Sequence, residues 1–184
     1  MPKKLATIGL IVACACPANG SEFDTKTLFS HKAWSVEVTH DASDGTLWCN
    51  AETTNRNGQS FNVLTFDNGY AAVGIYDSRW DLRKRPISFI IDIDYSRWNI
   101  DGSGEDQSVS IGLTDSQKAG DFLQELSDGS AVAVYNADEK RIANFSLAGS
   151  SAALMKLMEC WEAIQDVSTT QERDPFQSSK DPFN

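Results

Sequence analysis

SFNVLTFDNGYAAVGIYD, residues 60–77, contains one of the two strongest hairpin signals in this chain. Two runs of strand-forming residues, 60–66 and 70–77, stand on either side of Asn68-Gly69. Asn-Gly accepts the positive φ angles of a type I′ turn, the turn that joins neighbouring antiparallel strands. The stretch therefore predicts a β-hairpin.

Alternating apolar residues on both sides extend this hairpin into a larger antiparallel sheet. In WSVEVT (34–39), three apolar residues face one way and polar residues the other, as a half-buried strand requires. A second Asn-Gly pair at 57–58 joins the next strand, which predicts a four-stranded meander. NIDGSGED (99–106) is predicted to be a loop. The other predicted strands are TLWCNAET (46–53), ISFIIDID (87–94), QSVSIGL (107–113), AVAVYN (131–136) and RIANFSL (141–147).

Two helices are predicted late in the chain. Thr114 and Gln117 have the spacing of a capping box, and Gly129 ends the first helix. The Gly-Ser-Ser turn at 149–151 places one of its serines at the N-cap of the second helix. The fold class predicted is α+β, an antiparallel β-meander sheet with two late helices packed on one face. The apolar faces are Ala119, Phe122, Leu123 and Leu126 in the first helix and Leu154, Leu157, Met158 and Trp161 in the second.

The first twenty residues, MPKKLATIGLIVACACPANG, are predicted to be a signal peptide. A basic start precedes a short apolar run, residues 5–13, that cannot span a bilayer. Two cleavage routes fit. Ile-Val-Ala-Cys at 11–14 resembles a lipobox, in which Cys14 is acylated, whereas Ala15 and Ala18 fit ordinary cleavage. Either route implies export to the periplasm or the outer membrane of a Gram-negative bacterium.

The rest of the chain divides into three parts by composition. Residues 21–33 are predicted to be a polar connector, and residues 34–165 a single α+β domain. Residues 166–184 are predicted to be a disordered tail, because they are polar and almost free of aliphatic side chains.

The cysteines support export. Cys14 and Cys16 belong to the leader or its junction, which leaves Cys49 and Cys160 as the pair in the body of the protein. Both have apolar neighbours at strand or helix spacing, so both can point inward. The expected outcome is one disulfide, Cys49–Cys160, which suits an oxidising compartment.

The chain is acidic, with 26 Asp and Glu against 16 Lys and Arg. Lys3 and Lys4 lie in the leader, so the mature protein has 14 basic residues and a net charge of −12. Such a surface repels nucleic acid and anionic lipid, and neither is an expected partner. Contact with a membrane is expected only through a lipid anchor at Cys14.

Basic residues gather at one place in this acidic chain, YDSRWDLRKRP (76–86). Cationic side chains beside an aromatic ring can bind a phosphate, a carboxylate or an anionic glycan. The alternative is a charged loop that balances Asp77 and Asp81. The residues predicted to bind a ligand are Arg79, Trp80, Arg83, Lys84 and Arg85.

The sequence contains no convincing catalytic constellation. Gly-Ser-Ser-Ala-Ala at 149–153 departs from the G-x-S-x-G nucleophile elbow, and His31 and His40 are the only histidines. Asp92 and Asp94 share a strand face, whereas a glycosidase pair comes from facing elements. No enzyme activity, metal site or cofactor is therefore expected.

Residues 34–164 resemble small exported proteins of the invasion-associated locus B type. The resemblance rests on the opening WSVEV strand (34–38), an early Cys49, a β-rich middle and FSLAGSSAAL (145–154) before a helix. It implies a non-catalytic periplasmic or envelope-associated protein, and it gives no catalytic residues.

The expected function is that of a non-enzymatic exported protein that binds an envelope partner or an anionic ligand. The alternative is an acidic inhibitor or immunity-type protein that blocks a basic envelope hydrolase such as a lysozyme. In that case the negative charge would steer the association.

Overall fold

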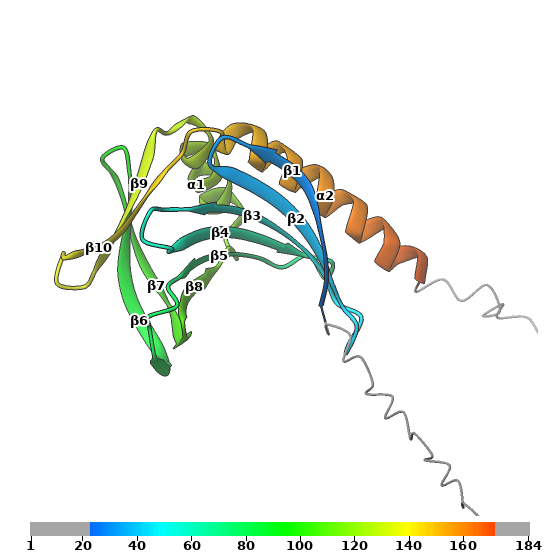
Figure 1. The fold of residues 1–184 in the computed structure, drawn as a ribbon, viewed down its shortest axis with the longest axis horizontal. Helices are drawn as coiled ribbons and strands as arrows, with labels where there is room; N and C mark the ends of the chain where they lie inside the picture. Colours follow the sequence, from blue (N-terminus) through cyan, green and yellow to red (C-terminus); the bar gives the residue numbers. More distant parts are fainter. Residues whose placement is uncertain (1–22, 172–184) are drawn as a thin grey trace, which may run out of the picture.

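The protein folds around one ten-stranded antiparallel sheet with two helices late in the chain, so the α+β class and the antiparallel sheet are confirmed (Figure 1). The computed structural model describes residues 23–171, with side chains as far as residue 166. The strand order is β1-β2-β3-β4-β5-β8-β7-β6-β9-β10. The elements are β1 (Phe23–His31), β2 (Trp34–Asp41), β3 (Leu47–Thr54), β4 (Ser60–Phe66), β5 (Ala71–Tyr76), β6 (Leu82–Ile93), β7 (Ser96–Asp106), β8 (Ser108–Gly112), α1 (Ser116–Asp128), β9 (Ala131–Asn136), β10 (Arg141–Ser146) and α2 (Ser150–Gln171).

The predicted four-stranded meander is confirmed, since β2, β3, β4 and β5 pair in sequence order. The prediction that these turns are of type I′ is wrong. Gly58 and Gly69 have positive φ angles of 76° and 84°, but the asparagine before each does not. In the first turn Gly58 N–H donates to the Asn55 carbonyl at 3.1 Å, and Asn55 N–H donates to Gln59 at 3.0 Å. Both hairpins therefore use a type I turn followed by a left-handed glycine.

Residues 21–33, predicted as a connector, contain strand β1. This strand pairs with β2 from Phe23 opposite Asp41 to His31 opposite Trp34. It is the edge of the sheet and is mostly exposed, so its residues lack the apolar alternation that marks a half-buried strand.

NIDGSGED, predicted as a loop, is part of strand β7, which pairs with β6 along most of its length. Gly102 and Gly104 stand opposite Ile87 and Arg85. A Cβ atom on Gly104 would lie 3.4 Å from Leu82 and 3.5 Å from Ile87, so this glycine faces the apolar interior. Glycine at such positions removes the alternating apolar signal of a strand.

The last strand returns to the first half of the sheet. Alternate carbonyls on the free edge of β10 accept side-chain hydrogen bonds from the beginning of the meander, at 3.1–3.2 Å. The rings of Phe61 and Phe145 lie 5.7 Å apart beside these bonds. The curved sheet in Figure 1 is thus closed by side chains, and the edge of β10 is protected. The donor and acceptor pairs are Trp34 to Ser146, Asn55 to Asn144 and Gln59 to Ile142.

Helix α2 lies against β1–β4, and α1 contacts α2. The predicted disulfide Cys49–Cys160 is confirmed, with a Cα–Cα distance of 6.2 Å, and it ties α2 to β3. Both cysteines are buried in the main apolar core. The core also contains large side chains from both halves of the sheet and from both helices, among them Trp34, Phe61, Ile75, Ile91, Leu126 and Leu157.

The helix starts differ from the predicted caps. Asp115, not Thr114, is the N-cap of α1, because its carboxylate accepts hydrogen bonds from two backbone N–H groups of the first turn. The Ser150 hydroxyl points to the Ser127 carbonyl at 3.5 Å, and the Gly149 carbonyl accepts the Ala153 N–H. Gly149 therefore caps α2. This helix continues to Gln171, past the predicted start of the tail at 166.

The predicted signal peptide, Cys14 and the predicted tail from residue 172 onwards lie outside the described residues. Within residues 23–171, no helix combines the length and the apolarity needed to cross a bilayer.

Candidate binding sites

The five residues predicted to bind a ligand lie between β5 and β6 and on the first residues of β6. Arg79 and Trp80 are in the turn, and Arg83, Lys84 and Arg85 begin strand β6. The basic segment is therefore mostly strand rather than loop. The register of β6 against β7 shifts between Leu82 and Arg85, so a β-bulge interrupts this stretch.

Arg79 is held by a buried carboxylate. Its Nε and Nη2 donate to the two oxygens of Asp77 at 2.8 and 2.6 Å, and Gln59 donates to the same carboxylate at 2.9 Å. The Asp77 side chain is 3% exposed. The hydrogen bonds from the Arg79 side chain lower the pKa of Asp77 to about 2, and burial opposes this shift. Arg79 is therefore engaged in the fold.

Lys84 also has an intramolecular partner. Its Nζ lies 2.9 Å from Oε2 of Glu105 on the neighbouring strand, and both side chains are exposed. Trp80 packs partly buried against the main core. A ligand would have to compete with Glu105 for Lys84, and it could reach only the exposed part of Trp80.

Arg83 and Arg85 differ from their neighbours. Both are exposed, and within the described part of the chain neither has a carboxylate at ion-pair distance. Arg83 and Arg85, on either side of Lys84, are therefore the two arginines of the predicted site that have no ion-pair partner among the described residues. The pairing of Arg79 with Asp77 agrees with the alternative of a charged loop that balances its own acids, and Arg83 and Arg85 are the cations that it leaves unpaired within residues 23–166.

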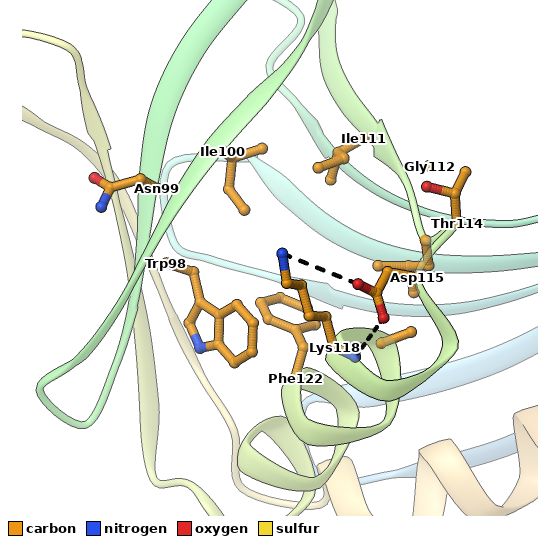
Figure 2. Close-up of a pocket in the computed structure, with 11 residues that line it drawn as sticks. Trp98, Asn99, Ile100, Ile111, Gly112, Thr114, Asp115, Lys118 and Phe122 are labelled. Atoms are coloured by element: carbon orange, nitrogen blue, oxygen red, sulfur yellow. Dashed lines mark hydrogen bonds and ion pairs between the residues drawn. The ribbon is translucent and has the colours of Figure 1, made fainter.

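A cavity of about 250 Å³ lies between β7, β8 and the first turns of α1 (Figure 2). Trp98 and Phe122 meet edge to face with ring centres 5.3 Å apart. Ile100 and Ile111 line it from the two strands, and Asp115 and Lys118 lie together on the helix side (Figure 2). Periodicity cannot reveal that β7 separates from β8, so the sequence does not predict this cavity.

A second apolar hollow, about 240 Å³, lies between α1 and α2. Met155 and Met158 border it and are 65% and 40% exposed. Thr65 also borders it, and its buried hydroxyl has no hydrogen-bond partner in the structure.

Asp92 near the end of β6 and Asp94 in the following turn both accept backbone hydrogen bonds, so the two acids do not share a strand face as predicted. Asp92 accepts from the Tyr95 N–H at 3.0 Å. Asp94 accepts from the N–H groups of Ser130 and Ala131 at 2.6 and 3.1 Å. Both carboxylates therefore stabilise turns. The described residues contain no group of three or more His, Cys, Asp or Glu side chains that could hold a metal ion.

No family model, curated protein or solved structure matches this chain.

Proposed function

We propose that this chain is a non-enzymatic exported protein that binds an anionic ligand or the acidic surface of an envelope partner. The observation that carries the proposal is the pair of exposed guanidinium groups, Arg83 and Arg85, which have no carboxylate partner among the described residues. Guanidinium groups bind carboxylates, phosphates and sulfates with two parallel hydrogen bonds. Free guanidinium groups in an otherwise acidic protein are therefore the most favourable anion site.

The environment of this pair also favours recognition of an anion. Asp77 is already neutralised by Arg79, and Glu105 is paired with Lys84. Asp77 and Glu105 therefore compete less with a ligand for the two free arginines, whereas the exposed Asp81 has no ion-pair partner among the described residues. The β-bulge changes the direction of the strand at this point, and bulges are common where a side chain is redirected at a functional site.

We assign the protein to the periplasm or the outer membrane. The Cys49–Cys160 disulfide is compatible with an oxidising compartment, and the apolar leader supports export. We also infer that both helices cover the same face of the sheet, since the hollow between them is floored by Val63 and Thr65 of β4.

Calorimetric titration with a sulfated oligosaccharide tests the binding proposal. Arg83→Ala/Arg85→Ala should weaken binding about tenfold or more, because two charge-assisted contacts are lost. Lys26→Ala/Lys156→Ala removes the same charge from β1 and α2 and is the matched control. Equal losses in both double variants would show that only net charge matters and would contradict the assigned site.

The second candidate function is inhibition of a basic hydrolase. It is favoured by the net charge of −12 expected after removal of the leader, which speeds encounter with a cationic enzyme. A lysozyme activity assay should then show inhibition that weakens steeply with added salt. Unchanged lysozyme activity at low salt and excess protein would exclude this candidate for that enzyme.

A further inference from the structure

Strands β7 and β8 separate from each other while each keeps its other partner. They pair directly only from Ser103 opposite Ser110 to Glu105 opposite Ser108. Strand β7 nevertheless stays paired with β6 as far as Ser96, and β8 stays paired with β5 as far as Gly112. The sheet therefore opens into a wedge, and the cavity of about 250 Å³ occupies its open end beside α1.

The apolar wall of this cavity is already ordered. The Trp98 indole N–H donates to Oε2 of Glu125 on α1 at 2.7 Å. The Phe122 ring stands at 89° to the indole. Figure 2 shows both rings on one side of the cavity, with Ile100 and Ile111 on the strands beyond them. A rigid aromatic wall lowers the ordering cost of binding a flat apolar molecule.

The Asp115 carboxylate also lines this cavity, and its second oxygen has an ion-pair partner, Lys118, but no hydrogen bond among the described residues. Oδ1 of Asp115 accepts the backbone N–H groups of Gln117 and Lys118, each at 3.1 Å. Oδ2 is 4.0 Å from Lys118 Nζ, which is beyond hydrogen-bond distance. Oδ2 can therefore accept a hydrogen bond from an N–H or O–H group of a ligand.

The geometry points to a second binding site, separate from Arg83 and Arg85, for a small neutral aromatic molecule with one hydrogen-bond donor. Its ring lies against Trp98 and Phe122, and its donor reaches Asp115. The cavity is slightly smaller than most ligand pockets, which span about 300–1,000 Å³, so it selects compact ligands. A neutral ligand is favoured because the carboxylate of Asp115 and the ammonium of Lys118 both line the cavity 4.0 Å apart, so the site has no net charge to attract an anion.

The test uses indole, whose ring carries one N–H donor, with N-methylindole as the matched ligand that lacks the donor. Binding is followed by calorimetry and by the NMR signal of the Trp98 side-chain N–H. Indole should bind saturably and shift this signal. N-methylindole should bind about threefold or more weakly, since it cannot donate to Asp115.

Two adjacent helix positions provide matched variants. Ala119 lines this cavity, whereas Gly120 lines the hollow between α1 and α2. Ala119→Leu should reduce indole affinity about tenfold or more by filling the site. Gly120→Leu should leave it within about twofold. Ile111→Phe fills the cavity from β8 and replaces Ala119→Leu if thermal melting shows that the helix variant is unfolded.

Three results would overturn the inference. In the first, the wild type shows no saturable binding of indole. In the second, Gly120→Leu loses indole binding while Ala119→Leu retains it. In the third, indole and N-methylindole bind with equal affinity. The second result would place the ligand between the helices. The third would remove Asp115 from the site.

Discussion

Replacing both cysteines of the β3–α2 crosslink, Cys49→Ala/Cys160→Ala, is predicted to destabilise the protein by about 6–7 kcal/mol. The disulfide joins residues 111 positions apart. In the chain-entropy model, a closed loop of about this length restricts the unfolded chain by about 5 kcal/mol. Removal of the two buried sulfur atoms adds about 1–2 kcal/mol of lost packing. A typical domain is stable by only about 5–15 kcal/mol, so the effect is a large share of the total.

Urea denaturation followed by circular dichroism measures this change. The midpoint should fall strongly, and the melting temperature should drop by about 10–20 °C. Wild-type protein under reducing conditions is the control, because it loses the crosslink but keeps the sulfur atoms. The reduced protein should therefore account for most of the loss. A difference below about 1 kcal/mol between the oxidised and reduced forms would refute the argument from loop length.

Three further predictions concern the buried polar network and helix α1. The pKa of Asp77 is depressed from 3.8 to about 2, so its contribution to stability is present above about pH 4 and is lost as the pH falls towards 2. Asp77→Asn should flatten this part of the stability–pH curve by about 1–2 kcal/mol, a value reduced for solvent screening because the Arg79 side chain is 64% exposed. An unchanged curve would show that the Asp77–Arg79 pair does not stabilise the fold. Gln59→Leu removes the amide donor to the buried Asp77 carboxylate and to the Ile142 carbonyl. Urea unfolding should therefore show a free energy of unfolding lower by about 2–4 kcal/mol. A decrease under about 0.5 kcal/mol would mean that water replaces the Gln59 donor. Gly120 lies within α1, and a Cβ atom there would meet nothing within 4 Å. Gly120→Ala should therefore raise the free energy of unfolding by about 0.5–1 kcal/mol. A lower free energy of unfolding would contradict the open environment of this residue.

Residue patterns predicted the first half of the sheet, because its strands alternate apolar and polar side chains and its turns contain Asn-Gly. The same logic failed where apolar alternation is absent. Strand β1 is an exposed edge, and β7 places Gly102 and Gly104 opposite β6. The β6–β7 turn was hidden as well. Its residues Asp94 and Tyr95 adopt positive φ angles of 44° and 78°. Such angles are uncommon for residues other than glycine, so these residue types do not predict a turn.

Long-range pairing explains what the sequence could not give for the candidate sites. Strand β8 pairs with β5, a contact between separate hairpins, and the wedge that forms the cavity beside Trp98 follows from it. In the basic segment, residue type correctly identified a cluster of cations. Asp77 and Glu105 pair with Arg79 and Lys84, and the remaining cations of the segment have no such partner among the described residues. Glu105 is distant in the sequence and comes next to Lys84 only in the folded chain.

We infer that Arg83 and Arg85 form the anion site, whereas the side chain of Arg79 is held within the fold by Asp77. NMR of the arginine side-chain Nε–H groups during titration with a sulfated oligosaccharide tests it one residue at a time. We predict saturable shifts of the Arg83 and Arg85 signals, with the Arg79 signal held in place by its bonds to Asp77. Arg83 and Arg85 signals that stay still, or equal shifts at Arg97 and Arg141, would contradict the account.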